Sequence, residues 1–311
     1  MKSYGSLFER VVAPANLAEA MARAARGKGD RGGVARFLRD ADAELAALRA
    51  ELLDGTYRPR PFQQFGILDP KPRTISCADF RDRVVHHAVC GVVAPCIERG
   101  LIADNYACRV GKGSHRALLR AKEFALRYGW FLKSDIRRYY DSVDHGILLG
   151  KLGRLCREAR LLRLFEVIVR QPLPGQTPGK GLPIGSLTSQ WFANLYLDET
   201  DHWLKEVRRV PGYVRYMDDL ACWSDSKPEL LALAADLEAF VSERLGVHLK
   251  PERTFVGPCY EGMPFLGWRV YPRLLRQQGA RLRLRRRKFA RREAQYGRGE
   301  ISAAKLQDCA W

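Results

Sequence analysis

The sequence predicts an α+β fold. Segments with helical and with strand periodicity alternate along the chain, but without the regular strand–helix–strand order that builds a doubly wound parallel sheet. The 311 residues, of which 46% are hydrophobic, can bury a sizeable core in one large domain or a few subdomains. No internal repeat occurs at a solenoid period.

An amphipathic pattern predicts a helix over residues 33–53. Its apolar residues recur at spacings of three and four, as they do along one face of a helix. They are Val34, Phe37, Leu38, Ala41, Leu45, Leu48 and Leu52. Residues 58–73 are rich in proline and are predicted to be extended and loop-like, because proline lacks an amide donor and biases its predecessor away from helix.

A second helix is predicted over residues 114–128. Ser114 is a suitable N-cap, and Gly129 can end the helix because glycine adopts the left-handed conformation at little cost. The apolar run at residues 130–136 is then predicted to be a strand.

The second half of the chain has equally local signals. Glycine, proline and threonine crowd residues 172–185, which predicts a loop leading into a helix over residues 189–208. Residues 213–223 are predicted to form two short strands joined by a tight turn. Residues 228–245 form the next predicted helix, with proline in its first turn and Gly246 after its end.

The cysteines and apolar runs exclude several classes of protein. None of the eight cysteines forms a Cys-x-x-Cys pair, and the six histidines add no zinc-finger spacing. The longest apolar run, residues 84–97, is shorter than the roughly 18 residues of a membrane span and contains His86 and His87. Residues 1–14 contain no apolar stretch ending in a small-residue cleavage site, so we expect no secretion signal. We therefore expect a cytoplasmic protein with reduced thiols and no membrane partner.

The net charge of +18 predicts a polyanionic partner, most commonly nucleic acid. Eleven Lys and Arg residues but only one acidic residue, Glu293, lie between Arg273 and Arg298. A solvated surface helix normally carries both signs of charge, so this stretch is predicted to bind nucleic acid. Its densest run is Arg285, Arg286, Arg287 and Lys288.

Three carboxylates suggest the chemistry. Asp135 lies at the end of the strand predicted at residues 130–136, and Asp218 and Asp219 lie on the turn of the predicted hairpin. Adjacent acids on a tight turn repel one another unless a cation neutralises them, and hard carboxylate oxygens suit Mg²⁺. Three carboxylates can hold two ions roughly 3.5–4 Å apart, the arrangement used for in-line phosphoryl transfer.

Seven sequence blocks resemble the conserved blocks of reverse transcriptases, in that family's order. The first to be recognised is the Tyr-Met-Asp-Asp tetrapeptide at residues 216–219. The others are residues 71–75 (KPRTI) with 80–87 (FRDRVVHH), 105–115 (NYACRVGKGSH), 131–145 (FLKSDIRRYYDSVDH), 181–190 (GLPIGSLTSQ), 245–254 (LGVHLKPERT) and 265–268 (FLGW). The resemblance covers about residues 60–272.

This resemblance implies a right-hand polymerase fold. We expect an N-terminal helical extension at residues 1–59 and the fingers and palm at 60–261, with an antiparallel palm sheet backed by helices. A short, basic, helical thumb is expected at 262–311. The implied activity is that of an RNA-directed DNA polymerase, a nucleotidyltransferase.

The resemblance also implies roles for individual residues. Asp135, Asp218 and Asp219 would be catalytic and would bind two Mg²⁺ ions, with Mn²⁺ as a substitute. Nucleotide-binding roles fall to Lys71, Arg73, Arg109, Tyr140, Ile184, Gly185 and Gln190. Tyr140 would exclude a ribose 2′-hydroxyl, so that dNTPs are the substrates. Lys250 and Arg253 would act electrostatically on pyrophosphate, since an arginine stays charged and is a poor proton donor.

Two departures from the usual pattern indicate a subgroup. Most reverse transcriptases carry Gln-Gly and Ser-Pro where this chain has Ile184-Gly185 and Ser189-Gln190. The pattern here resembles the enzymes of diversity-generating retroelements, which copy a template RNA with frequent errors at adenines. Isoleucine offers only apolar contact to the incoming nucleotide, and such contacts discriminate by about 1–3 kcal/mol. We hypothesise that Ile184 lowers fidelity in mutagenic retrohoming.

The expected partners are a template RNA and primer, the RNA–DNA duplex and dNTPs. The resemblance also implies a small basic helical accessory protein. Alternatives remain open: a retron-like or defence-associated reverse transcriptase, template-independent DNA synthesis, or a non-catalytic RNA-binding scaffold of the same fold. The intact Asp135, Asp218 and Asp219 argue against the scaffold.

Overall fold

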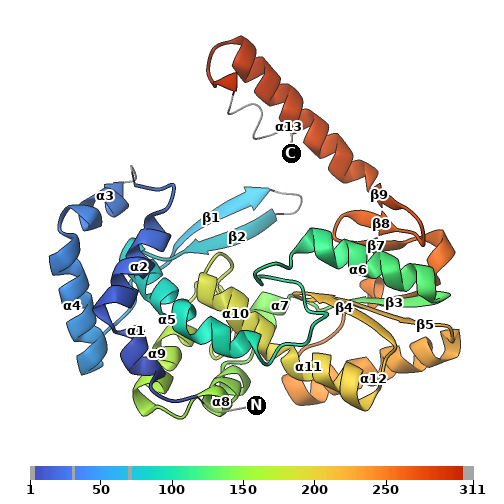
Figure 1. The fold of residues 1–311 in the computed structure, drawn as a ribbon, viewed down its shortest axis with the longest axis horizontal. Coiled ribbons are helices and arrows are strands. Elements are labelled where there is room, and N and C mark those ends of the chain that lie inside the picture. The colour runs from blue at the N-terminus through green and yellow to red at the C-terminus, as the bar shows by residue number, and fades with distance from the viewer. Residues whose placement is uncertain (1–3, 30–31, 69–71, 304–311) are drawn as a thin grey trace.

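The N-terminal part of the chain is helical and packs around one buried helix. A computed structural model describes residues 4–29, 32–68 and 72–303 (Figure 1). The first helices are α1 (Leu7–Val11), α2 (Pro14–Ala25), α3 (Gly32–Arg39) and α4 (Ala41–Asp54). They surround α5 (Phe80–Glu98), most of whose side chains are buried.

The prediction of a single helix over residues 33–53 is wrong, because this segment forms two helices, α3 and α4. Asp40 separates α3 from α4 with a non-helical backbone (φ −116°, ψ 39°). Aspartate competes with helix by bonding to nearby backbone groups, so it favours such a break. The break allows Phe37 of α3 to pack edge-on against Phe80 at 5.1 Å, while Leu48 and Leu52 of α4 reach the same core.

The proline-rich segment ends in a hairpin that the sequence did not predict. Strands β1 (Gln63–Leu68) and β2 (Pro72–Cys77) pair antiparallel. Nearly every residue of β1 is exposed, so the strand lacks the alternation of apolar and polar residues that identifies a half-buried strand. Lys71 falls in residues 69–71, outside the described residues.

The next helices precede the first strand of the central sheet or lie between its first and second strands. They are α6 (Ser114–Arg127), α7 (Tyr139–Ser142), α8 (His145–Leu155), α9 (Ala159–Val169), α10 (Leu187–Tyr196), α11 (Asp198–His202) and the π-helical η1 (Trp203–Val207). The helix predicted at 114–128 is confirmed, although Gly113 rather than Ser114 is its N-cap. The helix predicted at 189–208 is interrupted at Leu197, where α11 begins.

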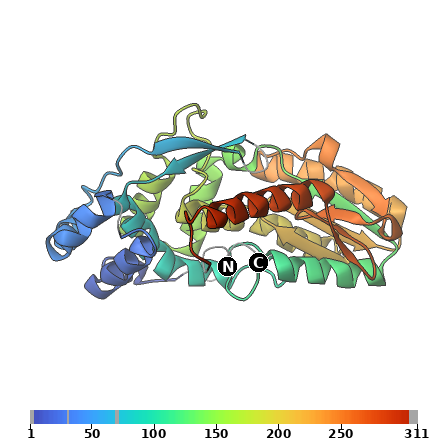
Figure 2. The ribbon, with the colours of Figure 1, turned by 90° about the horizontal axis from the view of Figure 1, so that it is seen from above.

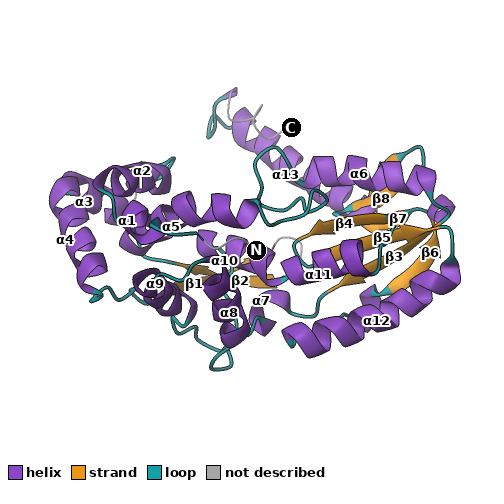
Figure 3. Cartoon of the chain, turned by 60° about the horizontal axis from the view of Figure 1, so that its bottom comes forward, coloured by secondary structure: helices purple, strands orange, loops and turns teal. Residues whose placement is uncertain are grey.

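The central sheet is antiparallel, with strand order β4-β5-β3-β6. Its strands are β3 (Trp130–Asp135), β4 (Gly212–Tyr216), β5 (Asp219–Ser224) and β6 (Phe255–Pro258). The predicted strand at 130–136 and hairpin at 213–223 are thus confirmed. Figure 3 shows the sheet between helices. On one face Leu132 and Leu220 share a core with α12 (Lys227–Leu245), and on the other Phe131 and Trp223 share a core with α6.

Helix α12 has the ends that the sequence predicted. Ser226 caps its first turn by accepting a hydrogen bond from the Glu229 amide, Pro228 lies in that turn, and Gly246 ends the helix at φ 61°. The short η2 (Pro251–Arg253) and η3 (Cys259–Glu261) flank β6.

The C-terminal region begins with a sheet that the sequence did not predict. Strands β7 (Met263–Phe265), β8 (Trp268–Val270) and β9 (Leu275–Gln277) form a three-stranded sheet, followed by the basic helix α13 (Gly279–Gly297). Met263, Phe265 and Val270 pack into the core shared with α6. Figure 2 shows α13 passing above the middle of the molecule. Among the described residues, no helix is long and apolar enough to span a bilayer.

Close packing of β6 on β3 gives a stability prediction. A Cβ atom at Gly257 would lie 2.8 Å from the Cζ atom of Phe131. We expect Gly257→Ala to lower the free energy of unfolding by about 1–3 kcal/mol, as overpacking does. Urea denaturation measures the change.

Gly150→Ala is the matched control, because a Cβ atom at this position in the interior of α8 would have no other atom within 4 Å. That variant should be about 0.5–1 kcal/mol more stable. A Gly257→Ala protein as stable as the parent would contradict the packing argument.

Candidate active site

Strand pairing brings the three predicted carboxylates together. Asp135 ends β3 and lies directly opposite Asp219, the first residue of the neighbouring β5. Asp218 precedes Asp219 in the turn that joins β4 to β5, and its carbonyl accepts a hydrogen bond from the Ile136 amide at 3.2 Å. The expectation that these acids cluster from two separate parts of the chain agrees with this geometry.

Burial and repulsion by neighbouring acids raise the pKa values of Asp218 and Asp219. Burial, and then the neighbouring Asp135, raise the pKa of Asp218 to about 6. Burial likewise raises the pKa of Asp219, although Lys133 opposes that shift. The cluster therefore concentrates negative charge that an additional cation would stabilise.

Two lysines already contact the cluster. The ammonium of Lys250 pairs with Asp135, and its backbone amide donates to the Asp135 carbonyl at 2.8 Å. The ammonium of Lys133 pairs with Asp219, donates to the Ser134 carbonyl at 2.9 Å and lies 5.8 Å from the centre of the Phe265 ring. Sequence reasoning selected Lys250 but missed Lys133. A lysine two residues before Asp135 in an apolar strand was the available signal, since both side chains share one face.

The donor chemistry of the cluster fits a divalent cation. Within the described ranges no three His, Cys, Asp or Glu side chains are arranged as a ready metal site. Two of the carboxylates instead face ammonium groups. Hard carboxylate oxygens suit Mg²⁺, and the raised pKa of Asp218 is the response expected of acids that lack full neutralisation.

Tyr140 lies beside the turn that joins β4 to β5. It is on α7, its hydroxyl is 4.0 Å from the Met217 sulfur, and its ring packs edge-on against Tyr139 at 5.8 Å. Burial raises its pKa, and the charge of Asp218 adds to that shift. The Tyr140 carbonyl accepts from the Leu182 amide at 2.8 Å, which connects α7 to the loop that carries Ile184.

Ile184 and Gly185 join this loop to the β1–β2 hairpin. The Ile184 carbonyl accepts from the Ser76 amide at 2.9 Å. Gly185 has φ +109°, and a Cβ there would lie 2.9 Å from Cγ2 of Ile75. Glycine is thus required at position 185 because the loop backbone comes close to Ile75 of β2. The sequence alone could not predict this contact. Gln190 lies half-buried on α10.

The predicted phosphate-binding residues have different surroundings. Arg73 is exposed on β2. Its positive charge opposes the upward shift that burial causes in the pKa of Tyr140. Arg253 is the last residue of η2. Its positive charge opposes the upward shift that burial causes in the pKa of Asp219. Lys71 lies outside the described residues.

Arg109 is engaged inside the protein. Its guanidinium pairs with Glu98 at 2.7 Å and donates to the carbonyls of Ile102 at 2.6 Å and Asn105 at 2.8 Å. Its side chain is 7% exposed. Contact with a triphosphate would require some of these bonds to be exchanged, so the structure gives Arg109 a role in holding its loop.

The four residues predicted to bind nucleic acid lie on a single helix. Arg286, Arg287 and Lys288 are exposed on α13, and Arg285 belongs to the same helix. The helix rises from the end of β9 and stands clear of the central sheet (Figure 1). A polar helix of this kind is suited to a charged partner rather than to an apolar core.

The three acids lie at one end of the two inner strands of the sheet, with Tyr140 beside them, as expected for the palm of a right-hand polymerase. The sequence profile of the family described as "Reverse transcriptase (RNA-dependent DNA polymerase)" matches residues 68–270, more than half of the chain. The chain therefore belongs to the reverse transcriptase family, a family of RNA-directed DNA polymerases that generally use divalent metals such as Mg²⁺.

Relatives lie among bacterial and intron-encoded proteins. Protein YkfC of Escherichia coli (strain K12) is 24% identical over 270 residues, which cover 73% of this chain and 71% of YkfC. The group II intron-encoded protein LtrA of Lactococcus lactis subsp. cremoris is 23% identical over 174 residues, 54% of this chain and 29% of LtrA.

Solved structures of telomerase share the fold. Telomerase from Candida albicans, in complex with a TWJ fragment of telomeric RNA, has a TM-score of 0.53 and 10% identity over 72% of this chain. Apo telomerase from Candida tropicalis, truncated from the C-terminal domain, has a TM-score of 0.50 and 12% identity over 75% of this chain. The chain spans 48% and 59% of these two proteins.

The raised pKa of Asp218 gives a prediction for the metal-free protein. Its folded-state pKa of about 6 lies above the ordinary 3.8, so the folded protein binds more protons than the unfolded protein between these pH values. Stability from this group is therefore lost as the pH rises through that window. Asp218→Asn should raise the melting temperature at pH 7, and the gain should shrink as the pH falls towards 4.

Asp236→Asn is the control, since Asp236 is an exposed carboxylate on α12 that pairs with Arg208. Thermal scans in a chelator measure both variants. A melting temperature for Asp218→Asn that is no higher than that of the parent at pH 7 would contradict the electrostatic argument.

Proposed function

We propose that this reverse transcriptase belongs to the diversity-generating retroelement group. It copies a template RNA into cDNA with frequent errors at template adenines, for mutagenic retrohoming. The observation that carries the proposal is an isoleucine at position 184, on a loop whose backbone is fixed by the Ser76 amide, where most of the family has glutamine.

Asp135, Asp218 and Asp219 are the proposed catalytic residues and Mg²⁺ ligands. Their clustering at one end of β3 and β5 supports this role. Bound Mg²⁺ would lower the pKa of the primer 3′-hydroxyl and neutralise the leaving pyrophosphate. The carboxylates orient these groups, and Lys250 and Arg253 would add positive charge at the leaving group. The ion pair of Lys250 with Asp135 and the effect of the Arg253 charge on Asp219 support this role.

The remaining residues would hold the substrates. Arg73 and Lys71 contact the triphosphate, because arginine grips phosphate bidentately and lysine acts as a point charge. Tyr140 walls off a ribose 2′-hydroxyl beside the turn that carries Asp218, which selects dNTPs. The position of this ring next to Met217 supports that assignment.

The basic face of α13 would track the phosphates of the template–primer duplex. Arg286, Arg287 and Lys288 are exposed there, and such contacts make binding strongly dependent on salt. The RNA complex of the Candida albicans telomerase supports an RNA partner for this fold. In this proposal the enzyme works in the cytoplasm together with a small basic helical accessory protein.

Primer extension on an RNA template with Mg²⁺ and dNTPs tests the activity. The parent protein should extend the primer, whereas Asp218→Ala should abolish extension and Asp236→Ala, which removes an exposed carboxylate, should not. Sequenced products should carry errors concentrated opposite template adenines. Accurate products would point instead to a retron-like or defence-associated enzyme. No extension, even with an accessory protein and cognate RNA, would point to a non-catalytic scaffold.

Ile184→Gln tests the source of the errors. Glutamine can hydrogen-bond the incoming nucleotide and reward correct geometry, so misincorporation at adenines should fall by roughly ten- to a hundred-fold. Ile184→Leu keeps an apolar contact and should retain the parent error spectrum. Sequencing of extension products measures both, and an unchanged spectrum in Ile184→Gln would remove Ile184 from the explanation.

A further inference from the structure

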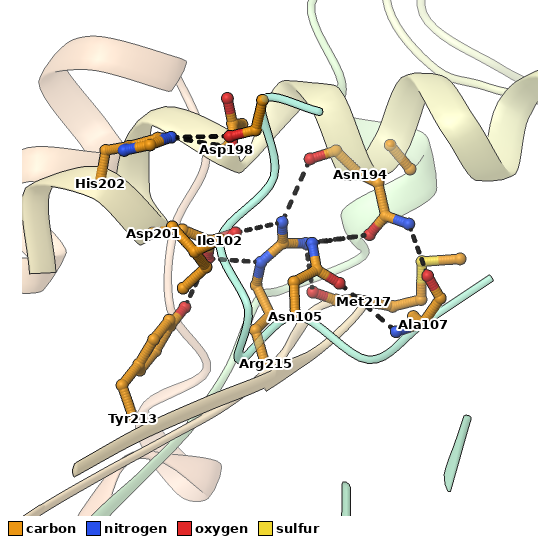
Figure 4. A network of polar contacts seen from close by, with 12 residues as sticks. Ile102, Asn105, Ala107, Asn194, Asp198, Asp201, His202, Tyr213, Arg215 and Met217 are labelled. Atoms are coloured by element: carbon orange, nitrogen blue, oxygen red, sulfur yellow. Dashed lines mark hydrogen bonds and ion pairs between the residues drawn. The ribbon is translucent and has the colours of Figure 1, made fainter. Parts of the chain in front are cut away.

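A buried arginine lies beneath the catalytic turn. Arg215 is on β4, three residues before Asp218, and its side chain is 0% exposed. It forms a bidentate ion pair with Asp201 of α11, which is also 0% exposed: Nε donates to Oδ1 and Nη2 donates to Oδ2, both at 2.6 Å (Figure 4).

The other donors of Arg215 reach the turn and α10. Nη1 donates to the Met217 carbonyl at 3.1 Å and to Oδ1 of Asn194 at 3.3 Å, and Nη2 donates to the Asn194 carbonyl at 3.1 Å. With the two bonds to Asp201, all five N–H groups of the guanidinium have acceptors. The arginine therefore has one fixed orientation, set by α10 and α11.

The turn needs such support. Met217 has φ +55°, the left-handed conformation that is costly for a residue with a Cβ atom and persists where its surroundings fix it. Its carbonyl is bonded to Arg215 on one side, and the following carbonyl, that of Asp218, is bonded to the Ile136 amide on the other. The backbone at Asp218 is thus held between Arg215 and the residue next to Asp135.

A buried ion pair is an expensive way to fill a core. Apolar residues of similar volume often give equal or greater stability, so a buried pair is weak evidence for a stabilising role. Lysine would supply the charge but not the planar fork that reaches both Asp201 and the Met217 carbonyl. Only arginine can direct hydrogen bonds to both the Asp201 carboxylate and the Met217 carbonyl from this position.

We propose that Arg215, oriented by Asp201 and Asn194, is a positioning residue for polymerisation. It holds the Met217 carbonyl so that the carboxylates of Asp218 and Asp219 meet that of Asp135. It touches neither substrate nor metal, and it acts through the backbone of the turn. The proposal rests on the catalytic role proposed above for the three acids.

The test compares Arg215→Lys with Tyr213→Phe. Tyr213 lies on the same strand, and its hydroxyl donates to the same Asp201 oxygen at 2.7 Å, but it makes no hydrogen bond to the turn. Arg215→Lys should lower kcat for primer extension by about ten- to a hundred-fold, as small misplacements of catalytic groups do. KM for dNTP and the affinity for template–primer should stay near the parent values. Tyr213→Phe should keep the parent kcat.

Coupling to Met217 separates positioning from general stability. Glycine accepts a positive φ without strain. Arg215→Lys should therefore cost less kcat in a Met217→Gly background than in the parent, whereas a merely structural loss would be the same in both. Equal losses in the two backgrounds, or equal losses for Arg215→Lys and Tyr213→Phe, would overturn the proposal. So would a folded Arg215→Lys protein with the parent kcat.

Two further arms keep the test decisive. If Arg215→Lys does not fold, the double variant Arg215→Gln/Asp201→Asn removes both buried charges together and should show the same loss of kcat. Mn²⁺ binding followed by electron paramagnetic resonance gives a readout without turnover. Arg215→Lys should weaken it by about ten-fold, as loss of a residue that supports metal ligands does. If the parent shows no extension, the proposed function fails, and this binding difference alone then supports or overturns the positioning role.

Discussion

The antiparallel register of β3 with β5 is the constraint on which the site depends. It sets Asp135 opposite Asp219 and leaves Asp218 in the adjoining turn. Side chains alternate between the two faces of a strand, so a slip of one residue would exchange the faces of Phe131 and Leu132, which pack in different cores. Two apolar cores therefore fix the register of β3 with β5. That register in turn brings the three acids together at one end of these strands.

Two lysines offset the repulsion among these acids, and a buried arginine supports the backbone of the turn that carries two of them. Lys133 and Lys250 contact the carboxylates directly. Arg215 acts one layer below, where its charge is matched by Asp201 and its remaining donors hold backbone carbonyls. Each lysine contacts the cluster through a single ammonium group, whereas the guanidinium of Arg215 is fixed by hydrogen bonds on every donor. The charges at the carboxylates and the support of the turn backbone are thus supplied by different residues.

Local signals explain which parts of this structure the sequence could predict. The β4–β5 hairpin and α12 were predicted because two short strands joined by a tight turn, a proline in the first turn of a helix and Gly246 at its C-terminal end are local features. The interruptions at Asp40 and Leu197 were missed, although aspartate at position 40 is a residue that disfavours the interior of a helix. The short, exposed strand β1 lacks alternation altogether. For the site, resemblance located the acids and Lys250. It could not show that Lys133 pairs with Asp219 or that Glu98 engages Arg109.

The backbone of the loop that carries Ile184 is held by contacts that do not involve the Ile184 side chain. The Ser76 amide holds the Ile184 carbonyl, and Gly185 fits against Ile75 with no room for a Cβ atom. The loop backbone is therefore set by the β1–β2 hairpin and by the Leu182 amide bonded to Tyr140. Because these contacts use backbone atoms, an exchange of glutamine for isoleucine at position 184 leaves them unchanged. In the function proposed above, the exchange would alter whether this side chain can hydrogen-bond the incoming nucleotide, while the loop backbone keeps its contacts.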